Sequence, residues 1–190
     1  MSTMYVAHTE LPAIGSGTLA EADIHSAVYD ASAGTVKRFT GSDAREFSNS
    51  GLVDCTASTL TITNATHAGR IVTLNRAAGI AVTLPIAAGT GARFQFFIGT
   101  AVTSNTTTIK VPDANGTMAG DAFMFQDGGD TMVGFEAGAT ADTVTLNGTT
   151  TGGLKGDFIE LFDVGANQWY VRCTLSGTGT EATPFSATVA

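Results

Sequence analysis

The chain has 190 residues, of which 43% are hydrophobic and only 14% are charged, and its formal net charge is −8. Its length fits one ordinary domain with an extension, which can bury a large enough core to fold without a metal or a disulfide. The few basic residues are scattered, and no apolar run approaches the length of about 18 residues that crosses a bilayer, so the sequence argues against a nucleic-acid partner and a membrane span.

The first 50 residues are expected to form a unit of their own. Residues 1–22 show no sustained helical or strand period and are interrupted by proline and glycine, which predicts an extended arm. Residues 24–29 and 35–39 suit two short strands joined by a glycine-containing turn. A short helix, capped by Thr40 or Ser42 and ending at Phe47, is the one helix that the sequence predicts.

From residue 51 to residue 190, short strands follow one another at a spacing near ten residues. The 23 glycines and many threonines supply turns and β-branched side chains. This pattern predicts an all-β domain, an antiparallel β-sandwich of the jelly-roll-like kind, preceded by the extended arm and the short helix. The expected strands are 59–63, 70–74, 80–84, 93–98, 107–111, 131–135, 143–146, 155–162 and 169–175.

Residues 82–99, VTLPIAAGTGARFQFFIG, predict a strand, a turn and a second strand. The glycines of the turn do not indicate a phosphate loop, because no helix follows whose N-terminus would bind an anion. Alternation places Phe94 and Phe96 on the core face. Phe97 lies on the opposite face, where we expect it to contact a partner.

Residue types that carry chemistry do not form a recognisable motif. His8, His25 and His67 lack the spacing of a zinc site, and neither a nucleophile elbow nor a P-loop lysine occurs. The segments DANG (113–116) and DGGD (127–130) predict turns, with a structural calcium site as the alternative. We therefore expect no enzyme, no cofactor and no metal.

A pair of carboxylates for glycoside hydrolysis is an alternative that the sequence leaves open. Such a pair requires two side chains from different segments to converge, with aromatic residues to stack on the sugar. The carboxylates that might converge are Asp121, Asp127, Asp130, Glu136, Asp157, Glu160 and Asp163.

The two cysteines are far apart in the sequence. Cys173 shares a strand face with Trp169, Val171 and Leu175, which indicates a small core residue. Two buried free thiols are the favoured interpretation, and a Cys55–Cys173 bridge is the alternative.

Two parts of the chain resemble recurrent segments of bacteriophage virion proteins. LAEADIHSAVYDASAGTVKRFTGSDAREF (19–47) resembles a short module in which a strand, a glycine turn, a lysine-containing strand and a small helix follow one another. HAGRIVTLNRAAGIAVTLPIAAGTGARFQFFIGTAVTSNTTTIKV (67–111), continued by DTVTLNGTTTGG and GTGTEATPFSATVA, resembles a β domain of phage structural proteins.

This resemblance implies a capsid decoration (cement) protein on the exterior of the virion, assembled in the host cytoplasm. It also implies a phage major capsid protein as partner, a homotrimer, and an N-terminal unit that anchors the chain to the capsid. The alternative is a tail-fibre or spike component that recognises a host glycan near Asn167, Gln168, Trp169 and Tyr170. The residues expected to contact partners are Tyr5, Leu11, Ile14, Ile24 and Phe97.

Overall fold

The computed structural model divides the chain into two compact units, Met1–Ser48 and Asn49–Ala190, next to the expected boundary at residue 50. Each unit is described by itself. The residues that the structure describes are 26–30, 35–39, 51–126 and 131–189.

In the first unit, β1 (Ser26–Asp30) pairs with β2 (Thr35–Phe39) in an antiparallel hairpin. The predicted hairpin is thus confirmed. The predicted arm and the predicted helix lie outside the described residues, as do the expected contact residues Tyr5, Leu11, Ile14 and Ile24.

Strands are the main regular secondary structure of the second unit, and its described part contains no helix of seven or more residues. The short helix α3 (Asn64–His67) lies between the expected strands 59–63 and 70–74, where the sequence predicted no helix. The strands are β3 (Leu52–Cys55), β4 (Thr59–Thr61), β5 (Ile71–Leu74), β6 (Ala81–Thr83), β7 (Arg93–Ile98), β8 (Thr107–Lys110), β9 (Thr117–Gln126), β10 (Met132–Glu136), β11 (Thr143–Leu146), β12 (Phe158–Gly165), β13 (Gln168–Gly177) and β14 (Phe185–Ser186).

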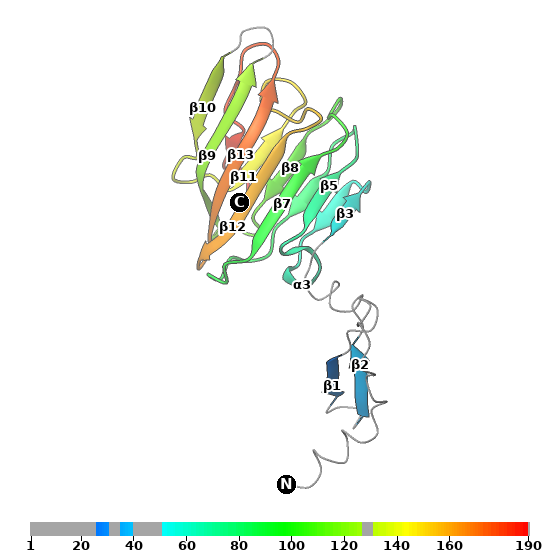
Figure 1. Cartoon of the computed structure of the whole chain (residues 1–190). Helices are drawn as coiled ribbons and strands as arrows, with labels where there is room; N and C mark the ends of the chain where they lie inside the picture. The colour runs from blue at the N-terminus through cyan, green and yellow to red at the C-terminus, as the bar shows by residue number, and fades with distance from the viewer. Residues whose placement is uncertain (1–25, 31–34, 40–50, 127–130, 190) are drawn as a thin grey trace. The chain divides into compact units, whose positions relative to one another are not determined.

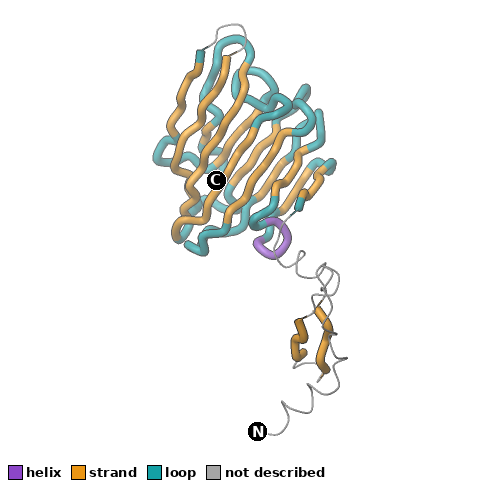
Figure 2. The backbone as a smooth tube through the Cα atoms, in the orientation of Figure 1, coloured by secondary structure: helices purple, strands orange, loops and turns teal. Residues whose placement is uncertain are grey.

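These strands form two sheets (Figures 1 and 2). The first has seven strands in the order β10-β9-β13-β12-β7-β5-β3, and Figure 1 shows it across the near side of the unit. The second has five strands in the order β14-β11-β8-β6-β4. The unit is therefore mostly β, as predicted.

The expectation of purely antiparallel sheets is wrong, because both sheets are mixed. β5 pairs in parallel with both β3 and β7, and β6 pairs in parallel with both β4 and β8. β9 and β13 form a further parallel pair. Parallel neighbours need a crossover connection, and a succession of short strands with turn signals does not reveal where the chain crosses over.

The parallel strands β3 to β8 come from three successive coils of the chain. β3 and β4 form the first coil, β5 and β6 the second, and β7 and β8 the third. Each coil contributes one strand to each sheet, so the same order arises in both sheets. The three coils are stacked as in a short β-solenoid, and the antiparallel strands β12 and β11 continue the sheets beyond the third coil.

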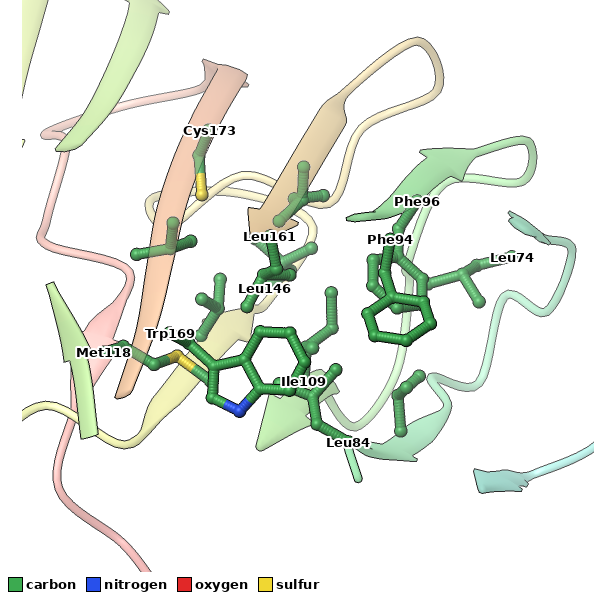
Figure 3. Packing of buried hydrophobic residues seen from close by; sticks show 14 of the residues in the cluster. Leu74, Leu84, Phe94, Phe96, Ile109, Met118, Leu146, Leu161, Trp169 and Cys173 are labelled. Carbon is green, nitrogen blue, oxygen red and sulfur yellow. The ribbon is translucent and has the colours of Figure 1, made fainter. Parts of the chain in front are cut away.

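One hydrophobic cluster joins the two sheets. Phe94 and Trp169 of the larger sheet pack with ring centroids 5.6 Å apart, and both side chains are fully buried. Figure 3 shows Trp169 among the labelled core residues, with Leu146 and Ile109 of the smaller sheet. The predicted core positions Phe94, Phe96, Trp169, Val171, Cys173 and Leu175 are confirmed.

Candidate interaction surface

The seven-stranded sheet presents a second face, opposite the core. Along β7 the buried side chains Phe94 and Phe96 alternate with the partly exposed Gln95 and Phe97, as the pleat of a strand requires. Phe97 therefore lies where the sequence predicted, off the core face. We call the side of this sheet that points away from the cluster the outer face.

An aromatic row crosses the outer face. Phe97 lies directly opposite Phe158 on the antiparallel neighbour β12, and Phe158 lies opposite Thr174 of β13. Thr174 is in turn level with Phe123 of β9. The three phenylalanines are half-buried and stand outside the core cluster, so the aromatic row is apolar surface that the fold itself does not cover.

A charged row runs parallel to the aromatic row and is displaced from it by two residues along each strand. Its members, in the order β7, β12, β13, β9 and β10, are Gln95, Glu160, Arg172, Asp121 and Glu136. Arg93 forms an ion pair with Glu160, and the Gln95 amide donates a hydrogen bond of 3.2 Å to the same carboxylate. The Glu160 side chain is 15% exposed, so it is held in one position within the row.

A third row completes the outer face, and we call it the tyrosine row. It consists of Arg93, Phe162, Tyr170 and Ala119. The guanidinium carbon of Arg93 lies 5.6 Å from the ring centroid of Phe162, and the Phe162 and Tyr170 rings are 6.1 Å apart. Such contacts restrict the motion of the Phe162 and Tyr170 rings, whose planes are tilted by 44° to each other.

The glycine-rich turn before β7 binds a carboxylate of its own chain. Asp163 accepts hydrogen bonds from the backbone N–H groups of Ala88, Gly89 and Thr90, at 2.9, 2.6 and 3.0 Å, and from the Thr90 hydroxyl at 2.6 Å. Burial alone would raise the pKa of Asp163, but these hydrogen bonds outweigh it and lower the pKa. The donors of this turn are therefore already occupied by Asp163.

Asp157 has an equally structural position. Its carboxylate accepts hydrogen bonds from the N–H groups of Gly153, Leu154 and Ser176. Burial raises its pKa in spite of these bonds. Asp157 and Asp163 are six residues apart along an extended segment, which corresponds to about 20 Å and exceeds the separation in a glycosidase. These two carboxylates do not form the pair considered above.

His67 and Asp113 are also engaged in local structure. Within residues 51–126 and 131–189, no three side chains of His, Cys, Asp or Glu gather as a metal site would require. His67 is buried in α3, and its Nδ1 accepts a hydrogen bond from the Thr63 N–H at 3.0 Å. Asp113 closes the DANG turn by accepting from the Asn115 N–H. The DGGD segment lies outside the described residues.

Both cysteines are free and buried, as favoured by the sequence, and no bridge joins them. Burial raises the pKa of the Cys173 thiol above its ordinary range, and the nearby Asp157 adds to this effect. A thiol with a raised pKa is a poor nucleophile, which fits a core role.

The four residues proposed to recognise a glycan, 167–170, differ in their exposure. Trp169 is wrong as a contact residue, because its side chain is 1% exposed and belongs to the core. Asn167, Gln168 and Tyr170 are exposed. Sequence reasoning missed Phe123, since β9 was not predicted. It also missed the alignment of residues from four strands in rows, which depends on strand order.

Comparison of the chain with protein-family models, with curated proteins and with solved structures finds no match to any of them. Among the described residues, no helix has the length and apolar character needed to cross a membrane.

Proposed function

We propose that the chain is a structural protein of a bacteriophage virion, and more specifically a capsid decoration protein bound to the outside of the assembled head. The virion assignment rests on the resemblance of residues 19–47 and of the β segments from residue 67 onward to parts of such proteins. The two sheets, joined by one buried cluster, are proposed to form the sandwich of that class.

The single observation that carries a binding role is the outer face. The core cluster is complete without Phe97, Phe158 and Phe123, and yet three aromatic side chains are aligned on one open sheet face. Apolar surface aligned in this way is typical of protein contact sites. The unit Met1–Ser48 is proposed as a second anchor, and a major capsid protein and further copies of the chain, in a trimer, as the partners.

Copy number in the virion tests this proposal. A decoration protein is expected in hundreds of copies per particle, and quantitative mass spectrometry of purified virions measures this number against the major capsid protein. A ratio typical of a tail, a few to a few dozen copies, would overturn the proposal. A second measurement is binding of a chain without residues 1–22 to expanded capsids, which is expected to be lost while the β unit stays folded.

The alternative is a tail-fibre or spike component that recognises a host glycan. Tyr170 favours it, because this ring is 36% exposed and is supported by Phe162 and Arg93. Sugar rings stack on such aromatic faces. Tyr170→Ala is the appropriate test on a glycan array, with Thr174→Ala as the control on the same strand. Trp169→Ala is unsuitable, since loss of a buried Trp costs about 3–5 kcal/mol of folding stability.

A further inference from the structure

We propose that the outer face of the seven-stranded sheet packs against the same face of a second copy of this chain. The two copies are related by a two-fold axis that lies between the faces, parallel to the strands and midway between β12 and β13. The proposal does not rest on the assignment to a virion.

The order of the strands makes the outer face complementary to itself under this axis. The rotation leaves each row at the same position along the strand direction. It places β12 opposite the partner's β13, and β7 opposite the partner's β9. Residues of one row therefore meet residues of the same row from the other side of the axis. The facing pairs are Glu160 with the partner's Arg172, Phe97 with the partner's Phe123, Phe158 with the partner's Thr174, and Phe162 with the partner's Tyr170.

Charge complementarity favours this axis over a two-fold axis that runs perpendicular to the strands. An axis perpendicular to the strands, along the charged row, would bring each charge against its own copy, Glu160 against Glu160 and Arg172 against Arg172. Like charges facing each other across an interface cost several kcal/mol. The axis parallel to the strands instead places opposite charges face to face twice, by symmetry.

The size of the face agrees with a stable dimer. Six strands at a spacing of about 4.8 Å and six residues at about 3.3 Å span roughly 30 by 20 Å. This projected area is roughly 600 Å² per partner, and accessible area exceeds projected area on a surface of standing side chains. It therefore approaches the ~800 Å² per partner of a standard interface. Two twisted sheets pack in this way with their strands aligned within about 30°.

The described residues also explain why the charged row can enter such an interface. Glu160 is already held by Arg93 and Gln95, so little side-chain freedom is lost on binding. Arg172 is exposed on the adjacent strand. The aromatic row lies on one side of these charges and the tyrosine row on the other, and both would exclude water from them.

Two charge-reversal variants test the contact. In Glu160→Arg, two arginines face each other twice across the axis, and in Arg172→Glu two glutamates do so. We expect the dissociation constant of the dimer to be on the order of 100-fold higher for each variant alone than for the unaltered chain. A mixture of the two variants restores both opposite pairs in a heterodimer, so mixing is expected to recover the mass of the dimer. Light scattering after size-exclusion chromatography measures the mass, and circular dichroism checks the fold.

Thr174→Arg is a further variant that does not depend on the ion pair within the chain. Thr174 is exposed, so the longer side chain fits the isolated unit, but it would face the partner's Phe158. We expect loss of the dimer. Ile86→Asp, at a residue 62% exposed in a loop outside the sheet, is the matched control and is expected to keep it.

Three outcomes would overturn the proposal. They are a mass of the unaltered chain that is not an even multiple of the protomer, a Thr174→Arg variant that keeps the full mass, and a mixture of the two charge variants that stays dissociated. If the chain also forms the proposed trimer, the unaltered mass is that of a hexamer and the variants fall to the trimer. Virion copy number is a separate measurement, so failure here leaves the proposed function standing and the converse also holds.

Discussion

At the scale of single residues, the second unit uses buried aspartates to fix its turns. Asp163 holds the turn at 88–90, Asp157 joins the turn at 153–154 to β13, and Asp142 accepts from the N–H groups of Thr188 and Val189 near the C-terminus. Each carboxylate satisfies backbone donors that would otherwise be buried without partners. Although the chain has few charged residues, three of them are therefore buried within this unit.

Asp163→Asn is expected to destabilise the unit by about 1–3 kcal/mol, because an amide offers one oxygen where the carboxylate offers two, and its NH₂ group faces backbone donors. Urea unfolding at pH 7 measures the change. Asp113→Asn, at a half-exposed turn with one such bond, is the control and is expected to change the free energy of unfolding far less.

The same variant predicts a pH dependence. Because the pKa of Asp163 is lowered in the folded state, its contribution is present above the unfolded pKa of about 3.9 and is lost as the pH falls through the folded pKa. Between pH 7 and pH 2, the unaltered chain should therefore lose more stability than Asp163→Asn. Parallel curves for the two proteins would show that Asp163 does not titrate in this way.

Alanine substitutions at two glycines distinguish the cost of an unfavourable backbone conformation from the cost of steric overlap. Gly91 and Gly148 both have positive φ, 72° and 80°, but only Gly148 approaches other atoms so closely that an added Cβ would overlap the carbonyl oxygen of Val102. Gly91→Ala is expected to cost about 1–2 kcal/mol from the left-handed conformation alone. Gly148→Ala is expected to cost roughly 1–3 kcal/mol more, as overpacking does. Equal midpoints in urea would contradict this difference.

At the scale of elements, α3 is a single turn held by side chains at both of its ends. The Thr63 hydroxyl accepts from the Thr66 N–H at 3.4 Å, and the His67 ring accepts from the Thr63 N–H. A helix this short gains little from its own backbone bonds. Its position between β4 and β5 therefore depends on His67 remaining a neutral acceptor.

His67 predicts acid sensitivity of this element. Burial lowers the pKa of His67, the nearby Arg70 lowers it further, and the Thr63 carbonyl opposes them. Stability is thus full above the unfolded pKa of about 6.5 and declines as the pH falls toward the folded value. We expect His67→Gln to flatten the stability curve in this range. NMR titration of the His67 ring checks the pKa directly, and a value above 6.5 would contradict the assignment.

The sequence predicted most strands but not their arrangement, and the reasons are physical. β7 and β13 alternate cleanly between buried and exposed side chains, so their faces were readable. β9, TMAGDAFMFQ, contains Gly120 and small residues and was missed, although its Met118, Ala122 and Met124 are buried. Strand order depends on contacts between distant segments, which alternation does not encode. Hence Phe97 was predicted to be off the core face, but its neighbours Phe158 and Phe123 were not.

At the scale of the whole molecule, the buried cluster formed by the described residues lies in the unit Asn49–Ala190. Every residue of the buried cluster, from Cys55 to Phe185, lies within it. The unit is large enough to bury a core without help from the rest of the chain. We therefore expect this unit to fold independently of the binding that is proposed for the first 48 residues.

A fragment comprising residues 49–190 is expected to fold by itself. Its thermal midpoint should lie within a few degrees of that of the full chain, because a loss of 1 kcal/mol shifts the midpoint of a domain this size by only about 2–8 °C. Calorimetry of both proteins measures this, with far-UV circular dichroism to check the β content. Absence of a cooperative transition in the fragment would show that the first unit completes the fold.

The three stacked coils also predict how the lengths of related chains differ from one another. The first strands of the coils begin at residues 52, 71 and 93, so one coil comprises about twenty residues. Each coil adds one strand to each of the two sheets. Duplication or deletion of a whole coil would keep the two sheets matched and leave the strands from β9 onward untouched. A change of half a coil would leave one strand without a neighbour. Relatives of this chain are therefore expected to differ in length in steps of one coil.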